Sequence, residues 1–183
     1  MHSIRMALLG ALVTLAACGK SDWPGEKERT LEEGHAPTPY TAEQLRDACP
    51  SGHVRVFEIE SAGGFVIKKR YRFLDADELG VTIESTVEGP AKQAPTSSRA
   101  TWRELQANAS FPKDSTQISE KRVETPAGTF DCLRYVVKSE ENGKSVVKYL
   151  DFARELPGMP VRMTLEFDGQ KVSAMTLVRL DSE

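Results

Sequence analysis

Residues 161–169, VRMTLEFDG, decide the fold class. Their apolar side chains fall at every second position: Val161, Met163, Leu165 and Phe167. A period of two places these side chains on one face of a β-strand and the polar ones on the other, as in an antiparallel sheet that is covered on one face only. The Asp-Gly pair at 168–169 is typical of a type I′ hairpin turn, in which both central residues need a positive φ. This stretch therefore predicts an antiparallel strand that ends in a tight hairpin.

The same signals recur along the rest of the chain. Residues 65–73 and 79–88 also alternate between apolar and polar side chains. Further strands are expected at 54–60, 118–124, 129–138, 145–153 and 171–180, with turn sequences at 63–64, 125–128 and 142–143. Together with 161–168 these segments make about eight strands joined by short turns. The pattern predicts a mainly β (α+β) domain, a curved antiparallel sheet or half-open β-barrel with two short helices.

The two helices are predicted from their N-terminal signals. Thr41 and Gln44 form the pattern of a capping box, so a short helix is expected from there to about residue 48. A second helix is expected over 99–107, with Ser98 as its N-cap. The stretch 89–97 before it is predicted to be a loop because of its composition.

The N-terminus has the organisation of an export signal. Residues 1–6 carry one positive charge, at Arg5, and residues 7–17, ALLGALVTLAA, are uncharged and apolar. This apolar run has the length of a signal peptide and is too short to span a bilayer as a stable anchor. It ends in LAAC at 15–18. Residues 1–17 are therefore predicted to be a signal peptide.

The LAAC sequence resembles the lipobox of bacterial lipoproteins, in which an aliphatic residue and two small residues precede a lipidated cysteine. The resemblance implies that Cys18 is the first residue of the mature protein and carries acyl chains, palmitate among them, that anchor it to a membrane. In Gram-negative lipoproteins an Asp after the cysteine favours retention in the inner membrane. Since Gly19 stands there, the resemblance implies the outer membrane, on its periplasmic or its exposed face. The alternative is an ordinary secretory signal that contains a cysteine.

The mature chain is predicted to consist of a tether and one domain. Residues 18–40 are polar, charged and interrupted by prolines, so they are read as a lipidated N-terminus with a flexible tether. Residues 41–183 form the β-rich envelope domain. Hydrophobic content is 39% and charged content 28%, which is an ordinary balance for a globular domain. A net charge of −3 gives the chain no electrostatic reason to bind nucleic acid.

If Cys18 is acylated, two of the three cysteines remain, Cys49 and Cys132. The envelope beyond the inner membrane is oxidising, so an even number of cysteines there predicts a disulfide bond between them. The alternative is a pair of buried free thiols.

The sequence offers little basis for catalysis or metal binding. Of the three histidines only His53 falls in the predicted domain, and no Gly-x-Ser-x-Gly sequence accompanies it. No group of histidines and cysteines has the spacing of a zinc site, and no glycine-rich phosphate loop occurs. We therefore predict a non-enzymatic protein without metal or cofactor.

Two further motifs carry a second resemblance. VETPAGTFDCLRY at 123–135 and LPGMPV at 156–161 resemble a motif pair in uncharacterised exported β-proteins. The fold of those proteins is similar to the half-open barrel of Lol-type and mycobacterial lipoprotein carriers, with helices over an apolar concavity. The resemblance implies the same fold here and, as a fold-level analogy, binding of lipid or of a lipidated partner.

Two functions remain open from the sequence. Eight strands have more apolar surface than two short helices can cover, so a curled sheet either closes on itself or leaves a groove. In the first reading an outer-membrane lipoprotein binds an apolar ligand or lipidated partner in the groove, which is lined by Phe65, Ile67, Ile83 and Leu165. In the second, the same fold is packed solid and serves as an accessory subunit of a larger envelope complex. The sequence cannot separate them, because inward-facing residues look alike in a core and in a groove.

Overall fold

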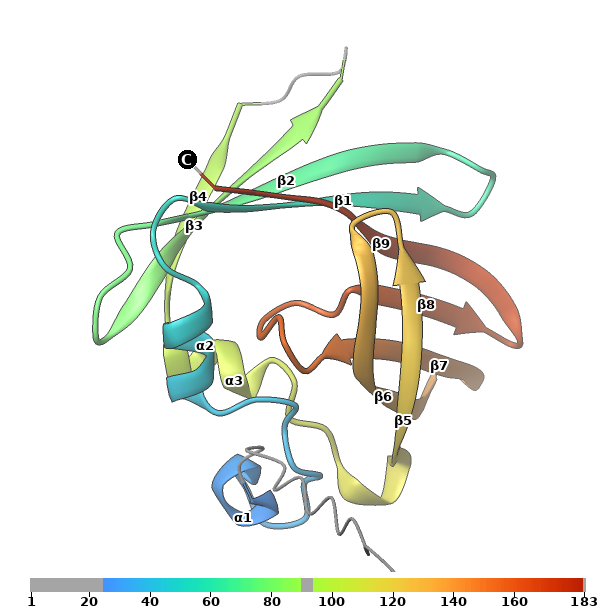
Figure 1. Ribbon diagram of the computed structural model, residues 1–183. Coiled ribbons are helices and arrows are strands. Elements are labelled where there is room, and N and C mark those ends of the chain that lie inside the picture. The colour runs from blue at the N-terminus through green and yellow to red at the C-terminus, as the bar shows by residue number, and fades with distance from the viewer. Residues whose placement is uncertain (1–24, 90–93, 183) are drawn as a thin grey trace, which may run out of the picture.

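The chain folds into one nine-stranded antiparallel sheet that curls around two short helices, and a third short helix lies below them (Figure 1). The computed structural model describes residues 25–89 and 94–182. The strands are β1 (His53–Ser61), β2 (Val66–Leu74), β3 (Gly80–Glu88), β4 (Thr96–Thr101), β5 (Thr116–Thr125), β6 (Gly128–Glu141), β7 (Lys144–Ala153), β8 (Arg162–Phe167) and β9 (Gln170–Ser182). Their order in the sheet is β4-β3-β2-β1-β9-β8-β7-β6-β5. The predicted fold class, a curved antiparallel sheet with few helices, is confirmed.

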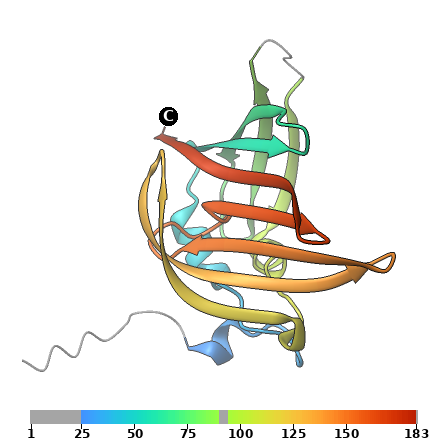
Figure 2. The same cartoon turned by 90° about the vertical axis from the view of Figure 1, so that its right-hand side faces the viewer.

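Two meanders make up the sheet. Strands β1 to β4 follow one another as antiparallel neighbours, strands β5 to β9 do the same, and β9 pairs with β1 to join the two meanders. The register shifts between β1 and β9 at Val56/Phe57 and between β8 and β9 at Leu165/Glu166. Such irregularities increase the local twist of a sheet. Figure 2 shows how strongly the strands of the second meander bend around the interior.

The predicted hairpin turns lie where the sequence places them. Asn142 and Gly143, between β6 and β7, have φ values of 53° and 74°. Asp168 and Gly169, between β8 and β9, have φ values of 48° and 76°. Positive φ at both central residues is the conformation of a type I′ turn, which matches the twist of the strands on either side.

The first predicted helix is confirmed and the second is shorter than predicted. In α2 (Ala42–Ala48) the Thr41 hydroxyl accepts from the Gln44 backbone N–H, and the Gln44 side chain accepts from the Thr41 N–H, which completes the capping box. Helix α3 spans Trp102–Ala107, with Thr101 rather than Ser98 as its N-cap. Residues 96–101, predicted as loop and helix start, instead form β4, because they pair with β3 along the edge of the sheet.

The prediction of a flexible tether over residues 18–40 is wrong for residues 25–40. Residues 25–40 include the short helix α1 (Glu26–Arg29) and pack onto the domain. The Tyr40 hydroxyl, which is buried, donates to the carbonyl oxygen of Ala153 at 2.6 Å, and Thr38 is buried beside it. The folded domain therefore begins before residue 41. The predicted signal peptide, 1–17, and Cys18 lie outside the described residues.

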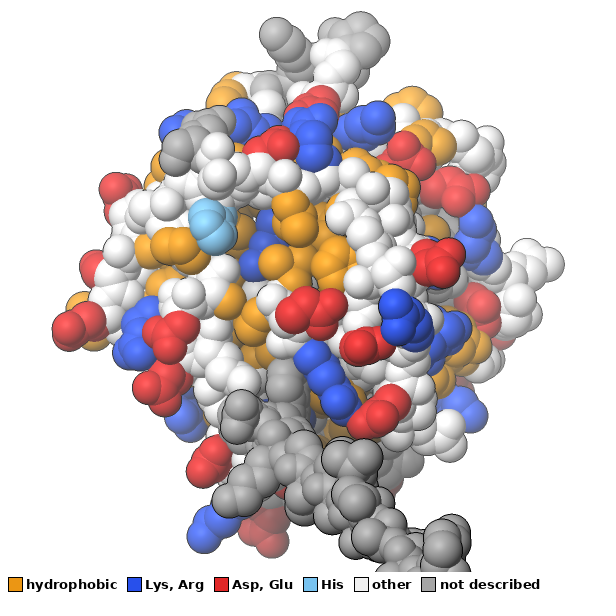
Figure 3. Space-filling model, in the orientation of Figure 1, with side chains coloured by type: hydrophobic (Ala, Val, Ile, Leu, Met, Phe, Trp, Pro, Cys, Tyr) orange, Lys and Arg blue, Asp and Glu red, His pale blue; other side chains and the backbone are white. Residues whose placement is uncertain are grey.

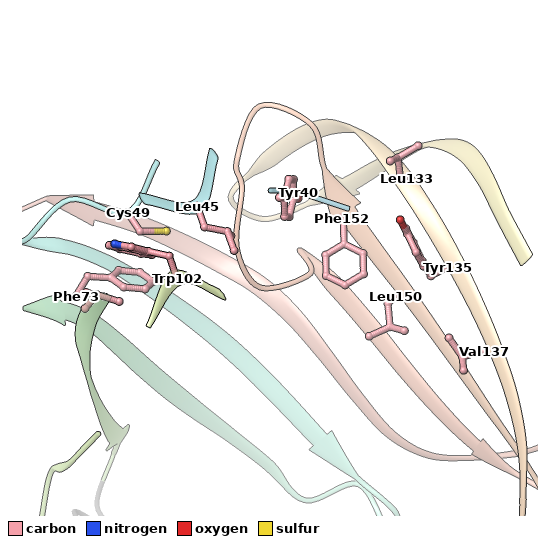
Figure 4. Close-up of a cluster of buried hydrophobic side chains, with 11 residues drawn as sticks. Tyr40, Leu45, Cys49, Phe73, Trp102, Leu133, Tyr135, Val137, Leu150 and Phe152 are labelled. Carbon is pink, nitrogen blue, oxygen red and sulfur yellow. The ribbon is translucent and has the colours of Figure 1, made fainter. Parts of the chain in front are cut away.

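The buried side chains form two clusters that meet inside the curl of the sheet. Figure 4 shows the first cluster, in which Cys49, Phe73 and Trp102 gather on one side and side chains of β6 and β7 on the other. On the second side the rings of Tyr135 and Phe152 lie edge to face, with centroids 5.4 Å apart. The second cluster combines β1 and β9 with the β5–β6 hairpin: Phe57, Val123, Phe130, Cys132, Ala153, Val161, Met175 and Leu177.

Candidate functional site

An apolar cavity of about 440 Å³ lies inside the curl of the sheet. Four parts of the chain enclose it: the concave face of the sheet, helices α2 and α3, the segment before α2, and the loop 154–161 between β7 and β8. The sheet contributes Ile59, Tyr71, Phe73, Ile83, Leu150, Phe152, Met163 and Met175. Figure 3 shows hydrophobic side chains gathered in a hollow at the centre of this face, with charged side chains around it. The cavity separates the two sides of the first cluster, since residues of both sides line it.

The floor of the cavity is a row of side chains that crosses four neighbouring strands. Ile59 of β1 is opposite Met175 of β9, Met175 is opposite Met163 of β8, and Met163 is opposite Leu150 of β7. Directly opposed residues on one face of an antiparallel sheet have their side chains in contact range. Two members of the row are methionines, whose unbranched side chains adapt to the shape of what they contact.

The helices cover the cavity from the other side. Leu45 of α2 and Leu105 of α3 line it. Gln106 ties the two helices together, because its side-chain oxygen accepts from the N–H of Ala42 at 3.0 Å and its nitrogen donates to the Thr38 hydroxyl at 3.1 Å. Gln106 is itself buried, so these hydrogen bonds satisfy a polar group that water does not reach.

The loop 154–161 projects into the interior of the curl (Figure 1). Its Gly158, Met159 and Pro160 line the cavity. The loop is held at its end by Val161, whose N–H donates to the Asp151 carbonyl at 2.8 Å. In its middle, the Pro157 carbonyl accepts from Nη2 of Arg55 at 2.8 Å. The loop, which contains the sequence LPGMPV, is thus a fixed wall of the cavity.

Only one of the four predicted lining residues lines the cavity. Ile83 does so. Phe65 lies in the turn before β2 and is 66% exposed, so it faces solvent. Ile67 and Leu165 are half-buried, each two or more residues along its strand from the cavity-lining Tyr71 and Met163. The period of two predicts the face of a strand but not how far along the strand the cavity extends, and that depends on where the helices and the loop pack.

The predicted disulfide bond is absent, and Cys49 and Cys132 are both buried free thiols. Cys49 directly follows α2 and belongs to the first cluster. Its sulfur lies 3.6 Å from the Pro157 carbonyl oxygen. Cys132 belongs to the second cluster, and its sulfur lies 3.7 Å from the Phe130 carbonyl oxygen. The argument from an even count fails here because each thiol is packed into a different part of the core.

We expect both thiols to react slowly in the folded protein. Burial raises the pKa of Cys49, and burial with the nearby Asp151 raises the pKa of Cys132 to about 12, so little of the reactive thiolate exists at neutral pH. Iodoacetamide should label neither residue in buffer and both in denaturant, without any reductant. Peptide mapping by mass spectrometry identifies the labelled sites, and a need for reductant before labelling would contradict the free thiols.

Neither a group of metal-ligating side chains nor a membrane-spanning helix is found among the described residues. No group of three or more histidines, cysteines and carboxylates in 25–89 and 94–182 lies close enough together to hold a metal ion. Over the same ranges no helix is both long and apolar enough to cross a bilayer.

The comparisons with known proteins concern the fold. No protein-family model matches the chain, and no curated protein matches it in sequence. Among solved structures, the chain is similar to a crystal structure named a "putative lipoprotein" from Parabacteroides distasonis. The two are 13% identical, with a TM-score of 0.50, and the match covers 73% of this chain and 96% of the other. At this identity the likeness establishes a shared fold.

Proposed function

We propose that the protein is a lipid-anchored, non-enzymatic binding protein of the bacterial envelope, which holds an apolar ligand or the acyl chain of a lipidated partner in its half-barrel. The observation that carries the proposal is the apolar cavity between the sheet and the helices. Its volume of about 440 Å³ lies within the range of small-molecule sites, roughly 300–1,000 Å³. Protein interiors are otherwise close-packed, with few voids larger than a water molecule.

The lining suits a flexible hydrocarbon chain better than a polar metabolite. Most of the lining side chains are aliphatic or aromatic, and methionines from β8, β9 and the loop can adjust to an occupant. Each methylene group of an acyl chain that leaves water for such a site contributes about 0.8 kcal/mol. An acyl chain therefore gains affinity from its length without specific polar contacts.

The sequence motif at Cys18 supports the lipid anchor, and the fold shared with a protein named a lipoprotein agrees with it. We further propose that the anchor lies in the outer membrane, because Gly19 follows the cysteine. A shuttle between membranes must leave its membrane, so an anchored protein of this fold acts as a receptor, a bridge or a stationary binding module.

One observation favours the second candidate, an accessory subunit of an envelope complex. Phe65 and Val66, neighbours at the tip of the β1–β2 hairpin, are both exposed large hydrophobic residues. Exposed apolar side chains that lie close together are suited to contacts with another protein. This candidate does not require anything to enter the cavity.

A charge placed in the cavity separates the two candidates. Ile83→Glu is expected to weaken binding of a fluorescent fatty-acid probe at least tenfold, because an unpaired carboxylate in an apolar site repels the chain and binds water. Phe65→Glu adds the same charge outside the cavity and is the matched control, which should bind as the wild type does. Equal binding by wild type and a folded Ile83→Glu variant would rule out the cavity as the site.

The anchor is tested at the cysteine itself. Replacing Cys18 with Ser should leave a chain without acyl groups and without cleavage at the lipobox, because the hydroxyl cannot form the thioether. The intact mass of the protein purified from membranes shows both whether acyl groups are attached and whether the signal peptide has been cleaved. A wild-type protein with an unmodified Cys18, or with cleavage elsewhere, would contradict the anchor.

A further inference from the structure

A buried positive charge lies directly behind residues that line the cavity, and it has no ion-pair partner among the described residues. Arg55 of β1 is 2% exposed, and it is the largest of the fully buried side chains. Among the residues that the structure describes, no carboxylate forms an ion pair with it. Buried arginines are as a rule paired with an acid, since an isolated buried charge is strongly unfavourable.

The contacts that the guanidinium makes with the described residues are with neutral groups. Its Nη2 donates to the Pro157 carbonyl at 2.8 Å and lies 3.5 Å from the Cys49 sulfur. Its carbon lies 5.3 Å from the centre of the Phe73 ring, within range of a cation–π contact. Its Nη1 is buried and has no hydrogen-bond partner within residues 25–89 and 94–182. Part of the hydrogen-bonding capacity of the group, and all of its charge, is thus left without a negatively charged partner.

The residues around Arg55 are cavity residues. Cys49, Phe73 and Gly158, which contact it, all line the cavity. Gly158 lies directly against Nη1, because a Cβ at that position would be only 2.4 Å from this nitrogen. Tyr40 also lines the cavity, and its hydroxyl lies within the electrostatic reach of Arg55. The charge is therefore situated at the boundary of the apolar space.

We infer that the cavity takes an acyl ligand with a single anionic headgroup, a carboxylate or a phosphate, and that Arg55 supplies the positive charge that receives it. This inference rests on the proposed function and specifies the ligand for the same site. The planar guanidinium binds carboxylate and phosphate oxygens through paired N–H donors, and such charged hydrogen bonds are stronger than neutral ones. An anion beside Nη1 accepts a hydrogen bond from this nitrogen and compensates the buried charge of Arg55. The hydrocarbon chain then lies along the row of side chains from Ile59 to Leu150.

The test compares three ligands of equal chain length: dodecanoate, dodecyl phosphate and the uncharged dodecanol. Binding is measured by titration calorimetry on the full chain with Cys18→Ser, so that no acyl group of the protein competes for the cavity. We expect the wild-type cavity to bind at least one of the two anions about tenfold or more tightly than dodecanol. A larger preference for dodecanoate indicates a fatty acid, and a larger preference for dodecyl phosphate indicates a phospholipid headgroup.

Variants of Arg55 assign the preference to this residue. Arg55→Met and Arg55→Gln should reduce the ratio of anion to alcohol affinity to about one, while dodecanol binds as well as before or better. Their dodecanol binding also reports that the cavity is folded. Arg99→Gln removes the same charge from an exposed ion pair with Asp77 and should keep the wild-type ratio.

The outcomes distinguish the inference from the proposed function. If the wild type binds neither the anions nor dodecanol, the proposed function is wrong. If it binds all three equally, or if the preference persists in a folded Arg55→Met variant, the inference is overturned and the apolar binding site stands.

Discussion

Replacing Arg134 with methionine is expected to lower the free energy of unfolding by about 3–5 kcal/mol. Arg134 of β6 lies opposite Asp151 of β7, and its Nε and Nη2 donate to the two carboxylate oxygens at 2.6 and 2.7 Å. The Asp151 side chain is 1% exposed. Without Arg134 its charge stays buried without a partner, which is the costly way of breaking a buried ion pair.

Urea unfolding followed by circular dichroism measures the effect. The double variant Arg134→Met with Asp151→Leu should recover most of the lost stability, because neither charge is then left alone. Arg99→Met is the matched control, since it breaks an exposed ion pair with Asp77 that contributes at most about 1 kcal/mol. A loss of less than 1 kcal/mol in Arg134→Met would show that Asp151 finds water or another partner.

Gly80→Ala should destabilise the protein by about 3 kcal/mol, at the upper end of what overpacking costs. Gly80 opens β3 opposite Thr101 of β4. A Cβ at this position would lie 2.2 Å from the carbonyl oxygen of Ala100 and 2.9 Å from the Cα of Thr101, both backbone atoms that cannot rotate away. The two strands must therefore move apart at the residue that caps α3.

Two measurements follow this substitution. The urea midpoint reports stability, and probe binding should fall as well, because α3 carries Leu105 and Gln106 to the cavity. Gly25→Ala is the control, since a Cβ there meets no atom within 4 Å and φ is −58°. An unchanged midpoint for Gly80→Ala would mean that the β3–β4 pairing is looser than described.

The parts of the fold that local chemistry determines could be predicted from the sequence. The turns at 142–143 and 168–169 follow from residues that tolerate positive φ, and the capping box at Thr41 depends on residues three apart. Strand β4 was missed because its sequence, TSSRAT, has almost no apolar side chain, as suits a short edge strand. The packing of residues 25–40 was missed because it depends on distant partners, such as Ala153 for Tyr40.

The candidate site could be predicted only in outline. Apolar faces and a concavity follow from the period of two, but its depth and most of its lining come from tertiary packing, as Met159 and Met175 illustrate. Arg55 is ambiguous in sequence because the apolar phase of β1 changes between Val56 and Phe57, where the register with β9 shifts. If Val54 and Val56 mark the inward face, Arg55 points to water. If Phe57 and Ile59 mark it, Arg55 points to the interior. The structure places it inside.

The central claim is that the half-barrel holds an acyl chain, and a crystal structure with a fatty acid brominated at the end of its chain tests it most directly. We predict an anomalous bromine peak inside the cavity, near Leu150, Met163 and Met175, with the protein otherwise unchanged. No bromine in the cavity, with the acid absent or bound only on the outer surface, would contradict the account.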